Sequence, residues 1–260
     1  MARRAELDRY SLESVDRMLL VLHALEQNAG SSLDAVARTA GLSEATALRY
    51  LSSLSKHDLV ERDSESGEYR LGLTLFRLGN LAMRQRDIGE LASPLLEGLR
   101  DRFAESVNFA SKQLGQVMLV RVLESQNPVR KGARAGEIDP WHCTALGKAL
   151  LGAMDTGERD DVLADIDWAR FTPNTHVTRP QLDRDLEGVR ARAYAIDDEE
   201  SVEGLRCVGV SVTDHSGEAR FAISVSGPKS RMPFSRLEEI GEHLKSVAAD
   251  LSRTLAGTRN

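Results

Sequence analysis

The sequence predicts an α+β protein with an N-terminal winged helix-turn-helix, a linker helix and a second domain built on an antiparallel sheet. Three observations support this fold class. Two short amphipathic helical patterns flank a glycine turn within residues 31–55. A strand–turn–strand pattern follows them directly, and further along the chain paired strands are interspersed with helices. We therefore divide the chain into segments 1–71, 72–87 and 88–260.

Composition is that of a soluble globular protein. The chain has 260 residues, of which 41% are hydrophobic and 28% charged, enough for two ordinary domains. No apolar run approaches the roughly 18 residues that would span a bilayer. Two cysteines, Cys143 and Cys207, are too few for a disulfide framework. We expect a cytoplasmic protein with no membrane association.

Segment 31–55 carries the helix-turn-helix pattern. The first helix has an apolar stripe that ends near Gly41, and Ser43 then offers the N-cap oxygen of the second. The apolar positions of the second helix recur at intervals of four and three residues: Ala47, Leu51 and Leu54. This spacing gives the second helix one buried face.

The opposite face of the second helix suggests a partner. Its side chains are short or hydrogen-bonding and mostly uncharged: Ala45, Thr46, Arg49, Tyr50 and Ser53. Predicted strands 59–62 and 68–71 add Arg62 and Arg70. The pattern favours double-stranded DNA as the partner, with residues 44–56 in the major groove and both hairpin arginines on phosphates. The alternative is that this is simply a pair of amphipathic helices, which any fold can contain.

The net charge of the first 70 residues argues against DNA binding. Nine basic residues face twelve acidic ones, a balance of −3, so non-specific DNA affinity should be weak and sensitive to salt. Arg3 and Arg4 precede a predicted helix over 12–27. They form either a frayed terminus, which we favour, or an arm that reaches a minor groove.

Residues 72–87 are predicted to form a connecting helix with leucines along one side, namely Leu75, Leu78 and Leu81. An apolar face in this position would suit packing against a second copy of the chain. We expect a homodimer or a dimer of dimers.

The second domain is predicted to mix helices with hairpin strands. The strands are 107–113, 117–124, 204–214 and 218–226, and the helices are 91–103, 144–154, 158–166, 180–193 and 235–255. Thr144 and Thr156 are predicted N-caps, and Ser235 with Glu238 has the spacing of a capping box.

Four segments of this domain suit a small polar ligand. Residues 141–148 run into a helix start, where free backbone N–H groups attract anions. An acidic strand end at 195–200 contains Asp197, which could accept from a ligand hydroxyl. Segment 204–209 opens an apolar strand, and Ser224 and Ser226 point to the same side of another. These groups fit a ligand of carboxylate size.

The same segments resemble the IclR family of bacterial transcriptional regulators. The similar pieces are the winged helix-turn-helix, HCTALGKALL at 142–151, YAIDDEE at 194–200, EGLRCVGVSV at 203–212 and AISVSGPKSR at 222–231. The resemblance covers essentially the whole chain. One departure is Ser211, where the family often has proline in the strand after the cysteine.

The resemblance implies that the second domain is GAF-like and binds a small metabolite, usually an organic acid. By position, the effector residues would be Ala145, Leu146, Asp197, Cys207, Ser224 and Ser226. The chain would then be a ligand-responsive transcriptional regulator, a repressor or dual regulator of catabolic genes. Effector binding would change the spacing of the paired DNA-binding domains through the linker helix.

Other readings of these residues stay open. His142, Cys143, Asp197 and Cys207 offer zinc-ligand chemistry, although adjacent residues in an extended segment point to opposite sides. Cys207 with His142 would suit a hydrolase, but no third orienting group is evident. Cys207 also suits simple packing, and the pocket could be vestigial. We expect no catalytic residue, no metal and no cofactor.

Overall fold

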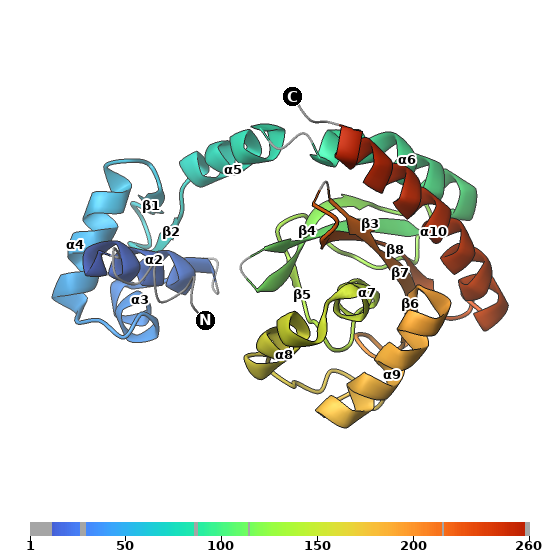
Figure 1. Cartoon of the computed structure of the whole chain (residues 1–260). Helices are drawn as coiled ribbons and strands as arrows, with labels where there is room; N and C mark the ends of the chain where they lie inside the picture. Colours follow the sequence, from blue (N-terminus) through green and yellow to red (C-terminus); the bar gives the residue numbers. More distant parts are fainter. Residues whose placement is uncertain (1–11, 27–29, 86–87, 114, 215, 258–260) are drawn as a thin grey trace. The chain divides into compact units, whose positions relative to one another are not determined.

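The computed structural model describes residues 12–26, 30–85, 88–113, 115–214 and 216–257 (Figure 1). The chain forms two compact units, Met1–Arg86 and Asp87–Asn260. Arg3 and Arg4 lie outside the described residues. Within the described ranges, every helix is too short or too polar to cross a bilayer.

The first unit is a winged helix-turn-helix followed by a helix. Its elements are α2 (Glu13–Glu26), α3 (Leu33–Thr39), α4 (Glu44–Ser55), β1 (Val60–Arg62), β2 (Tyr69–Leu71) and α5 (Leu73–Gln85). The predicted N-cap of α4 is confirmed, since the Ser43 hydroxyl accepts from the Thr46 N–H at 3.3 Å. Side chains of α2, α3, α4 and both strands share one core, with Leu51 at its centre and fully buried.

The second unit is built on a six-stranded antiparallel sheet of order β5-β4-β3-β8-β7-β6. Its strands are β3 (Ser106–Gln113), β4 (Gln116–Leu123), β5 (Ile138–Asp139), β6 (Ala195–Asp198), β7 (Leu205–Thr213) and β8 (Ala219–Pro228). Its helices are α6 (Ile88–Phe103), α7 (Ala145–Ala153), α8 (Thr156–Ala164), α9 (Arg179–Arg192) and α10 (Phe234–Gly257). Helices α6 and α10 cover one face, and α7, α8 and α9 lie on the other (Figure 1).

Two of the predicted caps in this unit are wrong. Thr144 caps α7 as predicted, accepting from the Gly147 N–H at 3.0 Å. Helix α8 instead starts at Thr156, because the Asp155 carboxylate, a stronger acceptor, takes the Glu158 N–H. Helix α10 starts at Phe234, since the Pro233 carbonyl accepts the first helical N–H groups and Ser235 already lies inside the first turn.

Helix α7 is buried along most of its length and lies against β6, β7 and β8. Two glycines allow the backbone around the start of α7 to pack closely, because a side chain at either position would crowd a carbonyl oxygen. A side chain on Gly209 of β7 would meet the Ala145 carbonyl oxygen at 3.0 Å, and one on Gly147 would meet the Trp141 carbonyl oxygen at 2.5 Å. The start of α7 is therefore held directly over the middle of β7.

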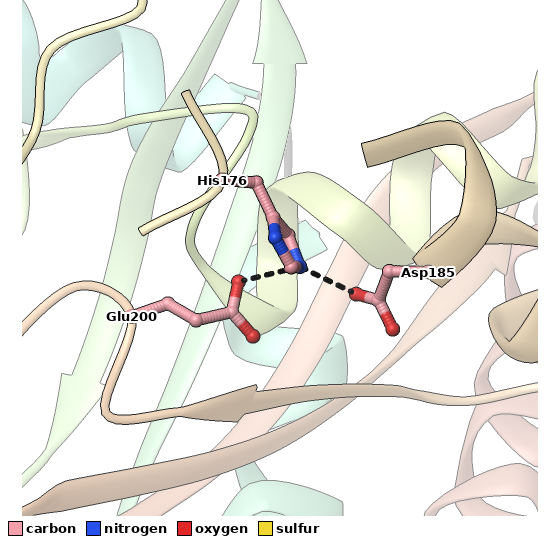
Figure 2. A group of neighbouring side chains, drawn as sticks. All are labelled: His176, Asp185 and Glu200. Carbon is pink, nitrogen blue, oxygen red and sulfur yellow. Dashed lines mark ion pairs between the residues drawn. The ribbon is translucent and has the colours of Figure 1, made fainter. Parts of the chain in front are cut away.

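A buried ion cluster ties α7 to the segments around it. The Lys148 ammonium is fully buried and donates to Asp185 of α9 at 2.6 Å and to Glu200 at 2.5 Å. The His176 Nε2 atom lies between the same two carboxylates, at 3.6 Å and 3.5 Å (Figure 2). One ammonium thus joins α7, α9 and the turn after β6.

Burial and charge act in opposite directions within this cluster. Burial raises the pKa of Glu200 to about 7, although Lys148 acts to lower it. Burial also acts to raise the pKa of Asp185, but His176 and Lys148 outweigh it and hold that pKa well below its usual range. Burial would lower the pKa of Lys148, and the two carboxylates reverse this. The lysine is therefore the fixed charge of the cluster.

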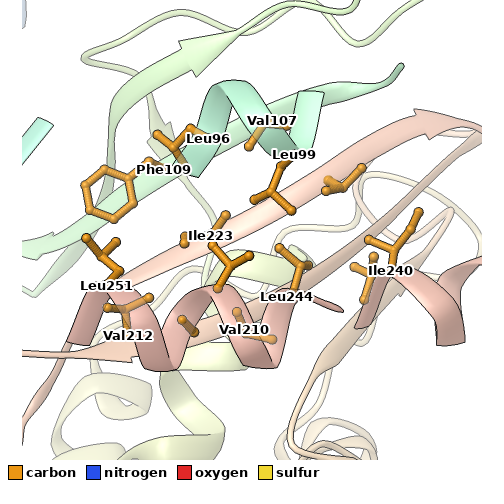
Figure 3. Packing of buried hydrophobic residues seen from close by; sticks show 14 of the residues in the cluster. Leu96, Leu99, Val107, Phe109, Val210, Val212, Ile223, Ile240, Leu244 and Leu251 are labelled. Carbon is orange, nitrogen blue, oxygen red and sulfur yellow. The ribbon is translucent and has the colours of Figure 1, made fainter. Parts of the chain in front are cut away.

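The opposite face of the sheet carries the larger apolar core. Branched side chains of β7 and β8, such as Val210 and Ile223, interlock with leucines of α6 and α10 (Figure 3). Phe109 of β3 closes this layer by stacking on Phe221, with ring centroids 5.5 Å apart. Because residues alternate along each strand, this packing fixes which residues face α7.

Replacing the buried lysine should strongly destabilise the second unit. Lys148→Met leaves the buried Glu200 and the half-buried Asp185 without their shared ammonium, although Arg192 still lies 3.5 Å from Asp185. We expect this to cost about 3–5 kcal/mol of unfolding free energy. The exposed pair of Lys245 and Glu242 provides a matched control, and Lys245→Met should cost under about 1 kcal/mol. Urea unfolding of the full chain measures both, and equal losses would contradict a structural role for the buried cluster.

Glu200 should make stability fall as pH rises. Its pKa is about 7 in the folded chain against an ordinary value of 4.5, so between these values the folded state holds a proton that the unfolded chain has released. Relative to Glu200→Gln, the wild type should therefore lose on the order of 3 kcal/mol as pH rises through this window, and no more above it. Paired urea titrations measure the difference, with Glu242→Gln as the exposed control. A difference that stays flat with pH would show that Glu200 is ionised throughout.

Candidate functional site

Helix α4 presents its predicted contact face beside α2. A groove of about 300 Å³ is lined by side chains of both helices: Ser14, Arg17, Thr46, Arg49, Tyr50 and Ser53. Four of the predicted DNA-contacting residues thus line one groove, and Ala45 is exposed on the same helix. Sequence reasoning missed the contribution of α2, because Ser14 and Arg17 lie among ordinary surface residues of an amphipathic helix.

The two hairpin arginines are not equivalent. The register pairs Arg62 with Tyr69 and Glu61 with Arg70, which puts the arginines on opposite faces of the hairpin. Arg62 donates to the Gly67 carbonyl at 3.2 Å and lies over the Tyr69 ring. The Arg70 Nε atom lies 3.4 Å from a Glu61 carboxylate oxygen. A joint phosphate contact by both arginines stays a prediction, and each would have to exchange its present partner.

Beneath the start of α7, the sheet carries a buried polar face made of Asn108, Cys207, Ser224 and Ser226. Cys207 pairs with Ser226 across β7 and β8, and Asn108 pairs with Ser224 across β3 and β8. The Asn108 amide donates to the Ser226 hydroxyl at 3.2 Å and to the Ser224 hydroxyl at 3.4 Å. All four residues are at least 98% buried. The structure thus brings together three of the six predicted effector residues.

Helix α7 supplies the cover over this polar face. Ala145 packs on Cys207, whereas the Leu146 side chain belongs to the apolar core beneath α7. Ala145 and Leu146 are the first two residues of the helix, so their N–H groups have no intrahelical partner. Leu146 can therefore act on a ligand through its backbone only.

Asp197, the sixth predicted residue, is fully buried and pairs with Cys207 across β6 and β7. Its carboxylate already accepts from the Glu200 N–H at 2.8 Å and from the Ser201 hydroxyl at 2.6 Å. This residue therefore shapes the turn after β6. A contact with a ligand stays a prediction for Asp197.

Three further polar groups belong to this site and were missed from the sequence. The Asn108 Oδ1 atom is buried and has no hydrogen-bond partner among the described residues. Burial acts to lower the pKa of Lys131, but Cys207, Asp139, Asp197 and Glu137 outweigh it and raise that pKa. Burial raises the pKa of Asp139 itself. An asparagine within the apolar strand β3 was a usable signal, but no pattern marks Lys131 or Asp139.

The metal and nucleophile alternatives gain no support from the geometry. Among the described residues, His142, Cys143, Asp197 and Cys207 do not form a group with metal-ligand distances, whereas His176, Asp185 and Glu200 do. Lys148 already forms ion pairs with the two acids of that second group. Burial raises the pKa of Cys207 to about 12, which leaves no thiolate for attack.

Comparisons with known proteins agree over nearly the whole chain. The model of the IclR helix-turn-helix domain matches residues 14–64, and that of the bacterial transcriptional regulator IclR C-terminal domain matches residues 80–253. The HTH-type transcriptional repressor AllR of Klebsiella pneumoniae is 34% identical over 244 residues, which are 94% of this chain and 90% of that protein.

Solved structures show the same fold. An IclR transcriptional regulator from Alicyclobacillus acidocaldarius is 25% identical, with a TM-score of 0.83 over 95% of this chain and 100% of that one. An IclR homolog from Microbacterium hydrocarbonoxydans, complexed with 4-hydroxybenzoate, is 23% identical, with a TM-score of 0.77 over 95% and 100%. The chain, a ligand-responsive DNA-binding regulator, belongs to the IclR family of bacterial transcriptional regulators.

Proposed function

We propose that this regulator is a repressor whose effector is a small organic acid bound between the start of α7 and the polar face of the sheet. The observation that carries the proposal is this buried row of polar side chains, which includes an orphan Asn108 oxygen. Buried polar groups without partners are costly, so a ligand that pairs with them has a ready source of affinity. The relative named a repressor supports the direction of regulation.

The protein groups proposed to contact the ligand differ in their chemistry. The free N–H groups of Ala145 and Leu146 and the serine hydroxyls suit a carboxylate. Cys207 contributes contact area. A helix start fixed by the Lys148 cluster gives these donors a rigid position, because the lysine ties α7 to α9 and to the turn that carries Asp197.

We further propose that α4 reads operator DNA through Ala45, Thr46, Arg49, Tyr50 and Ser53, with Arg62 and Arg70 of the hairpin on phosphates. The boundaries 1–71, 72–87 and 88–260 describe the corresponding parts of the chain. With DNA as its target, the protein would act in the cytoplasm. No catalytic step is proposed, because Cys207 is held as a thiol.

A homodimer or dimer of dimers would give the two-fold symmetry that operators usually share with their regulators. Helix α5 offers a surface for this assembly. Leu73 and Phe76 are 76% and 71% exposed, and Leu78 and Leu81 are also exposed. Effector binding would alter operator affinity only if it favours one spacing of the two DNA-binding units over another.

A mobility-shift titration tests the whole proposal. Purified protein is titrated onto DNA from upstream of its own gene, with and without a panel of small organic acids. We expect a specific shift that one acid releases. A shift that no acid alters would refute the organic-acid effector, and the absence of any shift would refute operator binding upstream of its own gene.

Arg49 and Arg17, which line the same groove, should differ in what they recognise. If Arg49 contacts a base, Arg49→Ala should weaken operator binding by about 1–3 kcal/mol and random DNA far less. Arg17→Ala should weaken both equally and reduce the salt slope of binding by about 1. Fluorescence anisotropy at several salt concentrations separates the two, with Arg253→Ala on α10 as control. Equal loss on random DNA would make Arg49 a phosphate contact instead.

Ser226→Ala should raise the effector concentration needed for release roughly tenfold and leave operator binding within about twofold of wild type, since it removes one hydroxyl from the polar face. Ser111→Ala, a buried serine on β3 that faces away from this row, provides the control. The measurement is the effector concentration that half-releases the operator. Asp197→Ala is a poorer test because it also breaks the turn after β6. Loss of operator binding in Ser226→Ala would assign that serine a purely structural role.

A further inference from the structure

The chemical class of the effector can be narrowed from three groups that the predicted effector set omits: Asn108, Lys131 and Asp139. Of these three residues, Asn108 has the best-defined hydrogen bonds. Its amide N–H groups are used by Ser224 and Ser226, while its Oδ1 atom is buried and unpartnered within the described residues. An oxygen acceptor can be satisfied only by a hydrogen-bond donor. A plain carboxylate has acceptors alone and would leave this oxygen orphaned.

Charge around the same face leads to a matching conclusion. Lys131 is half-buried, and in the described part of the chain its ammonium makes no ion pair. Cys207, Asp139, Asp197 and Glu137 all act to raise its pKa against burial, so the ammonium lies among acidic groups. An added monoanion with no donors would bring a further negative charge beside these acids. A ligand that also presents N–H or O–H groups offsets that repulsion by donating to them.

Resting on the proposed function, we infer that the effector is a small acid that also carries an N–H or O–H donor, such as a hydroxy acid or an amido acid. Its carboxylate faces Lys131 and the start of α7, and its donor reaches the Asn108 Oδ1 atom. Plain carboxylates of the same shape are discriminated against. This assigns Asn108 and Lys131 as specificity-determining residues of the site.

Matched acids that differ only in the donor test this inference on the full chain. The pairs are glycolate with propionate, 4-hydroxybenzoate with 4-methylbenzoate, and N-acetylglycine with 4-oxopentanoate. In each pair a methyl or methylene group replaces the O–H or N–H at nearly constant shape. Binding is measured by isothermal titration calorimetry. We expect the donor-bearing member of any pair that binds to do so roughly tenfold or more tightly, since its partner leaves a buried acceptor unpaired.

Variants of the two residues give an independent readout. Asn108→Leu should bring the two members of a pair to within about threefold of each other, and Lys131→Met should weaken both members alike. Circular dichroism and operator binding report whether each variant is folded. The comparison of acids on the wild-type chain holds even if Asn108→Leu fails to fold.

The outcomes separate this inference from the function on which it rests. Equal affinity within every binding pair would overturn the inference and leave an organic-acid effector intact. Binding by none of the six acids at millimolar concentration, in a protein that still shifts its operator, would overturn both. An unchanged preference in a folded Asn108→Leu would remove Asn108 from the site.

Discussion

The second unit depends on one buried ammonium. Lys148 lies on a helix that is otherwise apolar on nearly all sides, and its two carboxylate partners come from α9 and from the turn after β6. A buried charge is tolerated only when it is paired, so these three segments must come together for the unit to fold. The start of α7 lies above Gly209, where Ala145 packs on Cys207 of the polar row.

The two faces of the sheet differ in composition, and this difference determines which face carries the candidate effector site. The face toward α6 and α10 is filled with branched and aromatic side chains, and its packing sets the strand register. That register leaves Asn108, Cys207, Ser224 and Ser226 on the other face. Most of this row is hydrogen-bonded within itself, and the Asn108 Oδ1 atom is the one group of the row without a partner among the described residues. A ligand of the proposed kind would complete these hydrogen bonds.

Much of this architecture was predictable because local patterns agree with the final fold. Apolar spacing located α4, the Ser43 and Thr144 caps located helix starts, and alternation located the long strands. Some features were not predicted from the sequence, and each has a physical reason. Asp155 displaced Thr156 as a cap because an adjacent stronger acceptor took its role. Strand β5 is only two residues long, too short for any periodicity, and Lys131 lies in a loop, so the sequence shows no pattern for either.

The DNA-binding part of the chain and the effector-binding part differ in their electrostatics. The first 70 residues carry more acid than base, and the register turns Arg62 and Arg70 to opposite faces, so phosphate attraction alone is weak. Such a unit gains operator affinity mainly by joining two copies, which multiplies two modest interactions when their spacing fits. A regulator that binds in this way dissociates readily from its operator when one of the two interactions is lost. If the proposed acid pairs with Asn108 and Lys131 and thereby changes the spacing of the two copies, the second interaction would be lost and with it most of the operator affinity.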